Sequence, residues 1–402
     1  MAENSPAMVG QGELAQVATP RLLLVLLCGV AFATSLNNAM LNPVLPDIAD
    51  SLGVPIAAAG QLATASMITG AMAALVMGTL SDVYGRRTFV VGGLVALGVA
   101  SLALAFAPTF AWALLGRTLA GFGYVMAVTL AIVGDWYGGA QRDRAAARIL
   151  AADAVAWIAG VPIVAVAAQL LGWRAGVAGY AVVVLSVAVA CLAWLPNRRS
   201  QMSRVALRSV LRTIWREHRG RSELLLVLAA NGARSTCTMG FLAYASAFYR
   251  EVFGLATWQV GPLIAVTAVA FVLGTIAGGR WSGTVGPRRL SALGCLLTGT
   301  FICVNPLMPT LVLATLATLL FAMFGGITNS TLIALLLRLA TANRGATMAL
   351  NSTLVSLGNA LGVSVGGIGL AALGYPGLGL AVAAFAALAA GLVYTSGSDA
   401  PS

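Results

Sequence analysis

The feature that most constrains this chain is a series of uninterrupted apolar stretches, each long enough to cross a lipid bilayer. A membrane-spanning helix needs about 20 mostly apolar residues, because the hydrocarbon core of a bilayer is about 30 Å thick. Continuous apolar runs favour helices over a membrane barrel, whose strands alternate in polarity. The predicted spans are 21–45, 56–80, 88–107, 110–133, 145–169, 174–195, 223–249, 257–280, 288–306, 310–336, 345–370 and 375–395.

The composition agrees with a membrane protein. Of the 402 residues 59% are hydrophobic and 9% are charged, whereas a soluble domain carries about 25% charged residues. The run after Arg21 is as long as a membrane span, so we interpret it as the first helix and not as a signal peptide. The sequence therefore predicts an all-α integral membrane protein with twelve transmembrane helices.

The basic residues, all of them arginines, predict the orientation of the chain. The net charge is +11, and cytoplasmic loops of membrane proteins carry the excess of positive charge. Most arginines fall on one side if residues 1–20 and 396–402 are both cytoplasmic tails. The stretch 196–222 is the most basic, and we interpret it as a cytoplasmic linker that rests on anionic lipid. A site for nucleic acid or a regulatory partner is the less favoured interpretation of this stretch.

The linker divides the chain into two halves that resemble each other in sequence. Adding 201 to Gly78 gives Gly279, and adding 201 to Gly85 gives Gly286. Parallel internal repeats of this kind are typical of transporters. The sequence therefore predicts a six-helix bundle over residues 21–195 and a second six-helix bundle over residues 223–395.

One loop carries a family signature. The string Gly78-Thr79-Leu80-Ser81-Asp82-Val83-Tyr84-Gly85-Arg86-Arg87 lies between the second and third predicted spans. It resembles the signature loop of the major facilitator superfamily, Gly-x-Leu-x-Asp-x-x-Gly-Arg-Arg. The resemblance implies a conformational latch on the cytoplasmic side, in which Asp82 caps the start of the eleventh helix and Arg86 pairs with an acid that ends the fourth. Asp135 matches that acid. The proposed latch residues are Gly78, Asp82, Gly85, Arg86, Arg87 and Asp135.

Two further segments resemble motifs of the drug:proton antiporters and efflux permeases with twelve spans. Arg117, followed by Gly121, matches a buried arginine in the fourth helix that is implied to help proton transfer. The alternative is that Arg117 anchors to backbone carbonyls or extends toward the interface. Gly160-Val161-Pro162 matches part of the antiporter motif of the fifth helix and favours export.

Asp153 is the acidic residue that lies well inside a predicted span. A carboxylate removed from water can bind a proton near neutral pH, so we hypothesise that Asp153 and Arg117 couple transport to protons. A structural ion pair without coupling is the alternative, and the depth of Arg234 in the membrane favours it over Arg117 as the partner of Asp153. Arg234, Asn37 and Asn38 are candidates for the wall of a substrate cavity.

The leading interpretation is a proton-coupled secondary transporter that exports a drug, antibiotic or metabolite by alternating access. A proton symporter that imports a sugar or organic acid and a non-transporting membrane sensor are the alternatives. We expect a monomer in the inner (plasma) membrane that binds a small molecule and protons but no nucleic acid. We also expect no enzyme activity, metal or cofactor: the chain has one histidine, and without lysine it cannot form a phosphate-binding Gly-x-x-x-x-Gly-Lys loop.

Overall fold

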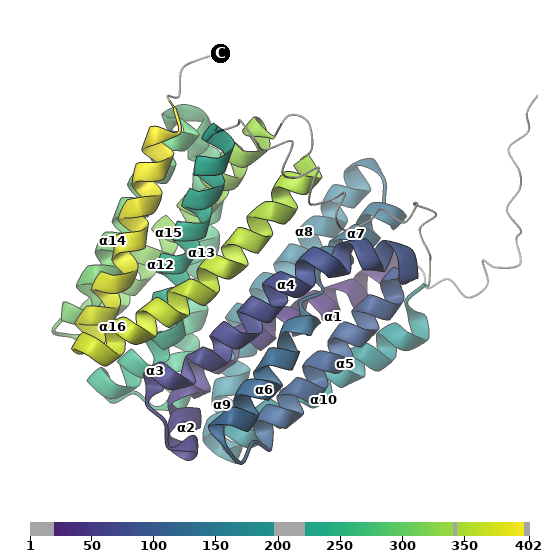
Figure 1. The fold of residues 1–402 in the computed structure, drawn as a ribbon, viewed down its shortest axis with the longest axis horizontal. Coiled ribbons are helices and arrows are strands. Elements are labelled where there is room, and N and C mark those ends of the chain that lie inside the picture. The colour runs from purple at the N-terminus through teal and green to yellow at the C-terminus, as the bar shows by residue number, and fades with distance from the viewer. Residues whose placement is uncertain (1–19, 197–221, 341–343, 398–402) are drawn as a thin grey trace, which may run out of the picture.

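A computed structural model describes residues 20–196, 222–340 and 344–397, which form helices joined by short turns (Figure 1). The predicted linker and both predicted tails fall almost entirely outside these residues. The helices before the linker are α1 (Pro20–Ala39), α2 (Leu41–Leu52), α3 (Ile56–Ala59), α4 (Gln61–Tyr84), α5 (Arg86–Ala105), α6 (Phe110–Ala120), η2 (Gly121–Gly123), α7 (Met126–Trp136), α8 (Gly139–Val155), η3 (Ala156–Gly160), α9 (Val161–Leu171) and α10 (Trp173–Trp194).

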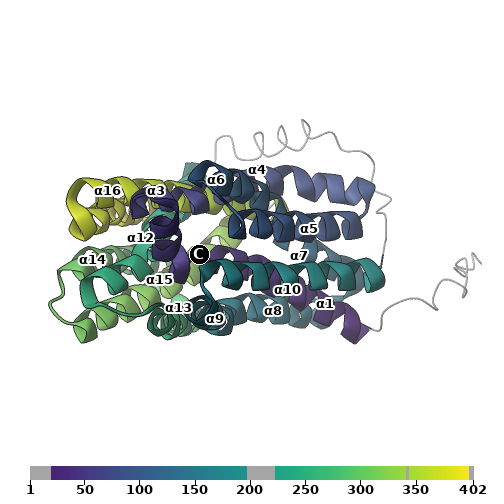
Figure 2. The same cartoon turned by 90° about the horizontal axis from the view of Figure 1, so that it is seen from below.

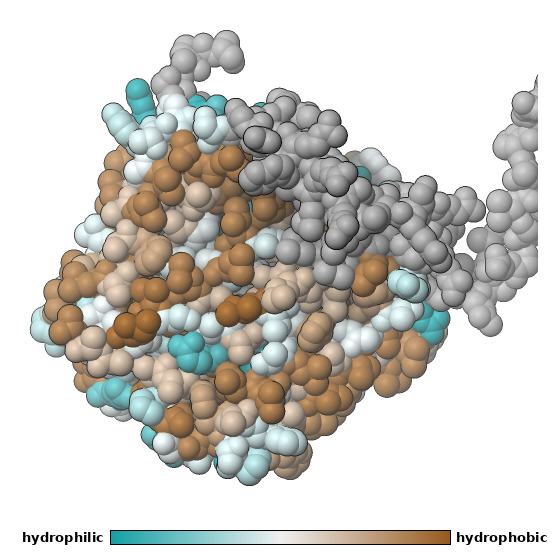
Figure 3. Space-filling model, viewed as in Figure 1, coloured by the Kyte–Doolittle hydropathy of each residue, from teal (hydrophilic) through white to brown (hydrophobic). Residues whose placement is uncertain are grey.

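The helices after the linker form a second group, which lies beside the first in both views (Figures 1 and 2). They are α12 (Ser222–Phe253), α13 (Thr257–Val285), α14 (Pro287–Val304), η4 (Asn305–Leu307), α15 (Leu311–Leu339) and α16 (Arg344–Thr395). The face drawn in Figure 3 is largely apolar. Large side chains such as Leu170, Leu171 and Ile368 are about 70% exposed or more on the surface, as expected for helices that face lipid.

Within the described residues, ten helical stretches are long and apolar enough to cross a membrane. The difference from the predicted twelve arises at two places. α12 is 32 residues long but is not among the ten, and its centre carries Asn231, Arg234 and three hydroxyl side chains. α16 covers two predicted spans, and its backbone leaves the helical region at Leu373 and at Gly374, whose φ is 67°.

The first predicted span is also interrupted. α1 ends at Ala39, and α2 begins at Leu41. Pro43 has no backbone N–H with which to bond the carbonyl of Ala39, so the helix breaks one turn before the proline. The interruption separates a segment that lines the centre of the molecule from α2, which packs against α12 of the other group.

The turn geometry of the first half recurs 201 residues later. Gly53 and Gly254 follow corresponding helices with φ values of 64° and 68°, and Gly85 and Gly286 have φ values of 100° and 91°. Residues with a Cβ rarely adopt these positive φ angles, so each turn depends on glycine. The two halves therefore share local backbone conformation as well as sequence.

Two helices that begin 201 residues apart are capped in the same way at their N-termini. The Thr109 side chain accepts a hydrogen bond from the backbone N–H of Trp112 at the start of α6, over 3.4 Å. The Thr310 side chain accepts one from Leu313 at the start of α15, also over 3.4 Å. Each threonine satisfies a backbone donor that the first turn of a helix leaves free.

The main contacts between the two groups join α2 with α12, α4 with α16 and α9 with α13. These contacts place residues from both groups around the centre of the molecule.

Candidate functional site

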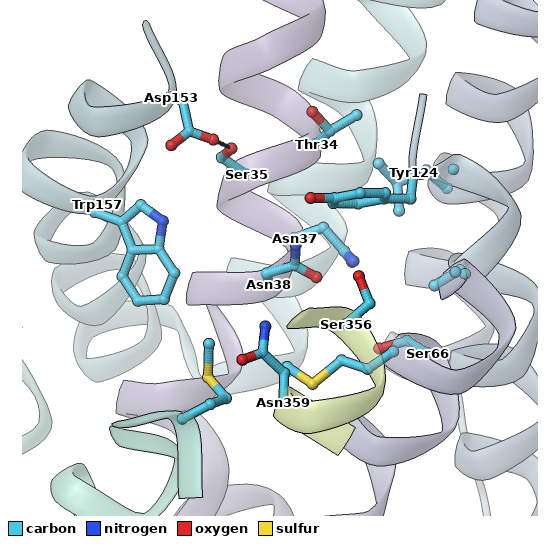
Figure 4. Close-up of a pocket in the computed structure, with 17 residues that line it drawn as sticks. Thr34, Ser35, Asn37, Asn38, Ser66, Tyr124, Asp153, Trp157, Ser356 and Asn359 are labelled. Atoms are coloured by element: carbon cyan, nitrogen blue, oxygen red, sulfur yellow. Dashed lines mark hydrogen bonds between the residues drawn. The ribbon is translucent and has the colours of Figure 1, made fainter. Parts of the chain in front are cut away.

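A polar cavity of about 190 Å³ lies at the centre of the molecule, between the two groups of helices (Figure 4). Most of its lining comes from the first group, including the predicted cavity residues Asn37 and Asn38 and the predicted proton-coupling residue Asp153. The second group contributes Met239, Ser356 and Asn359. Because both groups supply lining side chains, a change in their relative position would change the shape of the cavity.

Asp153 lies near the end of α8, where its carboxylate borders the cavity. The Ser35 hydroxyl donates a hydrogen bond to Asp153 Oδ1 and so connects α8 to α1 (Figure 4). Among the lining residues that the structure describes, Asp153 is the single acid and no basic residue accompanies it. The described cavity wall therefore carries one carboxyl group, together with the phenol of Tyr124.

An irregular turn begins three residues after Asp153. Residues Ala156–Gly160 form η3, a single π-helical turn that contains the cavity-lining Trp157. Such turns are uncommon and often occur at functional sites. Here the extra residue in the turn changes the angular spacing between Asp153 and the side chains that follow it.

Arg117 lies behind the cavity wall and is 1% exposed. Its guanidinium donates to Asn37 Oδ1 over 2.7 Å, to Ser66 Oγ over 3.0 Å and, through Nε, to the Leu62 carbonyl over 3.4 Å. One of the three acceptors is a backbone carbonyl, as in the alternative in which Arg117 anchors to the backbone. The other two are side-chain oxygens. The side chain joins the helix that carries it to α1 and α4 through neutral oxygen atoms.

Arg234 is buried within the second group and does not line the cavity. Its Nε donates to Asn231 Oδ1 over 2.8 Å, and its Nη2 donates to Asn329 Oδ1 over 3.2 Å. Asn231 in turn donates to Asn351 Oδ1 over 2.7 Å. Arg234 therefore belongs to an amide cluster that connects α12, α15 and α16.

Neither Arg117 nor Arg234 forms an ion pair with Asp153 in the described part of the chain. The predicted depth of Arg234 in the membrane favours it as the partner of Asp153. Depth along a helix, however, does not specify the direction in which a side chain points. Each arginine is directed toward neutral oxygen atoms of its own half. Asp153 instead interacts with Ser35, which the sequence analysis did not identify because a serine in an apolar span carries no distinctive signal.

Part of the predicted latch can be described. Arg86 Nε lies 2.5 Å from Asp135 Oδ2, and Arg86 Nη2 lies 3.4 Å from Asp135 Oδ1. Arg87 donates to the carbonyl of Leu192, and Gly85 provides the turn between α4 and α5. The side chain of Asp82 and the surroundings of Gly78 are outside the part of the chain that the structure describes. The structure thus brings together Arg86 and Asp135, the pair that the resemblance implied.

An ion pair that the sequence analysis did not identify joins the two halves away from the latch. Arg250 at the end of α12 donates from Nη1 to Asp47 Oδ2 and from Nη2 to Asp47 Oδ1, each over 2.8 Å. The Thr257 hydroxyl also donates to Asp47, over 3.4 Å. The two-pronged geometry is the strong form of an arginine–carboxylate contact. It fastens α2 to α12 at one end of the molecule.

The Tyr244 side chain makes a second contact between the halves near the same end. Its hydroxyl donates to the Val363 carbonyl over 2.9 Å and reaches the Ala57 carbonyl at 3.4 Å. The ring fits because Gly60 has no side chain: a Cβ there would lie within 3 Å of three Tyr244 atoms. Tyr244 thus fills a space between the first and second groups of helices.

Comparisons with known proteins agree with the motifs. A family model described as the Major Facilitator Superfamily matches residues 27–362 and 259–402. A chloramphenicol resistance protein of Streptomyces lividans is 27% identical over 278 residues, which are 67% of this chain and 67% of that protein. YceJ of Bacillus subtilis (strain 168), an uncharacterised MFS-type transporter, is 23% identical over 340 residues, which are 84% of this chain and 86% of that protein.

Solved structures show the same fold. A crystal structure of a bacterial homologue of the human lysosomal transporter Spinster, in an inward-facing and occupied conformation, superposes with a TM-score of 0.74. The alignment covers 94% of this chain and 96% of that chain at 15% sequence identity. At this identity the likeness concerns the arrangement of the helices.

Proposed function

Because this chain belongs to the major facilitator superfamily, we propose that it is a proton-coupled secondary transporter that exports a small organic molecule by alternating access. As a member of this family it is a multi-pass membrane transporter and not an enzyme. The proposal includes twelve spans, with α12 counted as one and α16 as two. It also includes cytoplasmic termini, a position in the plasma membrane and a monomeric state.

The observation that carries the proposal is the position of Asp153. A carboxylate in the wall of a central cavity can take up a proton from one side of a membrane and release it to the other when the cavity changes access. Asp153 has a neutral partner, Ser35, and no guanidinium within ion-pair distance among the described residues. No fixed cation therefore holds it in the charged form, so that it can serve as the exchangeable site.

Export is the favoured direction, and an uncharged antibiotic is the first substrate to test. The partial antiporter motif at Gly160-Val161-Pro162 and the resistance protein of Streptomyces lividans support this choice. Chloramphenicol, the compound in the name of that relative, is therefore the first probe.

The decisive experiment is transport driven by a pH gradient in proteoliposomes. An antiporter moves chloramphenicol toward the acidic compartment as protons leave it, whereas a symporter moves it toward the alkaline compartment. Asp153→Asn should abolish gradient-driven accumulation while the abundance of the protein stays unchanged. Asp143→Asn, which removes an exposed acid from the same helix, is the matched control and should transport normally.

Normal gradient-driven transport by Asp153→Asn would contradict the assignment of this carboxylate. Accumulation in the alkaline compartment would favour the import of a nutrient. Absence of transport for every compound of a broad panel, with the protein folded, would favour a non-transporting sensor.

A further inference from the structure

We propose that Arg117 fixes Asn37 as a hydrogen-bond donor in the cavity, so that the site selects uncharged molecules with a carbonyl or similar acceptor oxygen over molecules with an ammonium group. This inference rests on the proposed function, because it names the substrate class of the same cavity.

The orientation of the Asn37 amide follows from its contact with Arg117. A guanidinium can donate hydrogen bonds but cannot accept them. The atom that lies 2.7 Å from Arg117 Nη1 must therefore be the Asn37 oxygen, as the structure has it. The amide cannot rotate by half a turn without placing two donors against each other. The Asn37 nitrogen is consequently held on the opposite side of the amide.

The Asn37 nitrogen is available for a ligand. Asn37 lines the cavity but is only 4% exposed, and its Nδ2 has no protein acceptor within the described chain. In Figure 4 this nitrogen points toward the side of the cavity on which Tyr124 and Ser356 are drawn. An N–H that faces a cavity bonds to water while no ligand is present. A substrate oxygen can take the place of that water and accept the hydrogen bond.

The hydroxyl of the neighbouring Ser66 is already engaged. It accepts from Arg117 Nη2 over 3.0 Å and donates to the Ala63 carbonyl over 3.0 Å. Of the two cavity-lining side chains that Arg117 contacts, Asn37 is therefore the one with a free donor.

The positive charge of Arg117 also favours a carbonyl oxygen over an ammonium group at Asn37. Its three hydrogen-bond partners are neutral oxygens, so no carboxylate of the described residues pairs with its positive charge. In a medium of low dielectric constant, such a charge repels a second cation and strengthens the donors of an amide that it polarises. An ammonium group at this position would meet both an N–H and a nearby guanidinium. A carbonyl oxygen at Asn37 would meet a favourable partner, whereas the carboxylate of Asp153 borders another part of the wall, where Figure 4 draws it beside Ser35.

The test compares two probes that share one body. Chloramphenicol carries an amide carbonyl, and removal of its acyl group leaves an amine that is protonated at neutral pH. Binding to the purified full-length protein is measured by the ligand-dependent rise in melting temperature. We expect the wild-type protein to bind the amide at least tenfold more tightly than the amine. Asn37→Asp, which keeps an acceptor for Arg117 but replaces the donor with a carboxylate oxygen, should reverse this preference.

Two further variants keep the test decisive. Asn37→Ala should weaken amide binding at least tenfold without improving amine binding, and it does not depend on the folding of a buried acid. Asn329→Asp makes the same change beside the other buried arginine, Arg234, outside the cavity, and should keep the preference for the amide.

Three results would overturn the inference: a wild-type protein that binds neither probe or prefers the amine, an Asn37→Asp variant that keeps the preference for the amide, or an Asn329→Asp variant that reverses it as well. The proposed function fails in a different measurement. Loss of gradient-driven transport with normal selectivity in binding contradicts proton-coupled export but leaves the role of Asn37 in place.

Discussion

At the scale of single residues, the unusual feature is a pair of buried arginines whose observed side-chain partners are neutral. A charged side chain inside a membrane domain is costly and usually functional. Arg117 and Arg234 offset part of this cost through neutral oxygens of asparagine and serine side chains and of the backbone. In both halves an arginine therefore organises amide groups, and in the first half one of these amides, Asn37, borders the cavity.

The geometry of Arg117 predicts that lysine cannot replace it. Arg117→Lys keeps the charge but cannot direct three separate donors in the planar arrangement of a guanidinium. We expect the free energy of unfolding to fall by about 1–3 kcal/mol, because buried acceptors lose their donors. Thermal unfolding of the purified protein measures this change. The control is Arg144→Lys at an exposed position on α8, where we expect a change within about 0.5 kcal/mol; equal effects of the two substitutions would contradict the role of Arg117.

The sequence predicted part of the site because some polar residues are conspicuous in apolar spans. Asn37, Asn38 and Asp153 line the cavity, whereas Arg234 lies in a cluster of its own. The roles of Ser35 and Ser66 were not predicted, because short hydroxyl side chains are common in membrane helices. The contact between Arg117 and Asn37 depends on the rotation of two helices about their axes, which the sequence does not specify.

At the scale of elements, hydropathy located the helices well but not their irregularities. The predicted span 174–195 agrees with α10 within a residue at either end. α8 instead begins at Gly139, six residues before the predicted span 145–169, because its first turns are polar and exposed yet still helical. The π-helical turn after Asp153 was not predicted either, since no residue in Ala156–Gly160 requires it.

Glycines determine how closely α12 approaches α16. A Cβ at Gly240 would lie 2.6 Å from the Gly362 carbonyl oxygen and 2.6 Å from Val382 Cγ1. Gly240→Ala should therefore force the two helices apart and lower the free energy of unfolding by about 1–3 kcal/mol. Gly391→Ala, at a helical position of α16 with open space around it, should be neutral or slightly stabilising. Melting curves of the two variants test this contrast, and a stable Gly240→Ala protein would contradict the packing.

At the scale of the whole molecule, the hydrogen bonds described between the halves gather at one end. They involve residues 43–64 of the first half, residues 244–257 of the second half and Ser364. The ion pair of Asp47 and Arg250 is the charged member of this set, with exposed fractions of 28% and 20%. The molecule is therefore fastened at the α2–α12 end in this conformation, on the opposite side of the cavity from the latch.

Breaking this ion pair should shift the population toward states that are open at the α2–α12 end. A pair with partial exposure contributes up to about 1 kcal/mol, which corresponds to roughly a fivefold change in population. We expect Asp47→Asn to raise by about that factor the rate at which an impermeant maleimide labels a cysteine placed at Ala57. The double variant Asp47→Arg with Arg250→Asp should restore slow labelling, and an unchanged rate in the single variant would show that the pair does not hold this end closed.

Asp153, the one acid among the described lining residues, also makes the proposed transport sensitive to the membrane potential. If Asp153 carries one proton inward while an uncharged molecule leaves, each cycle moves one net elementary charge across the membrane. A membrane potential of 100 mV then contributes about 2.3 kcal/mol per cycle in addition to the pH difference. That energy alone sustains roughly a fiftyfold concentration ratio of the exported molecule. A cell with almost no pH difference across its membrane but a normal membrane potential would therefore still export the molecule against its concentration gradient.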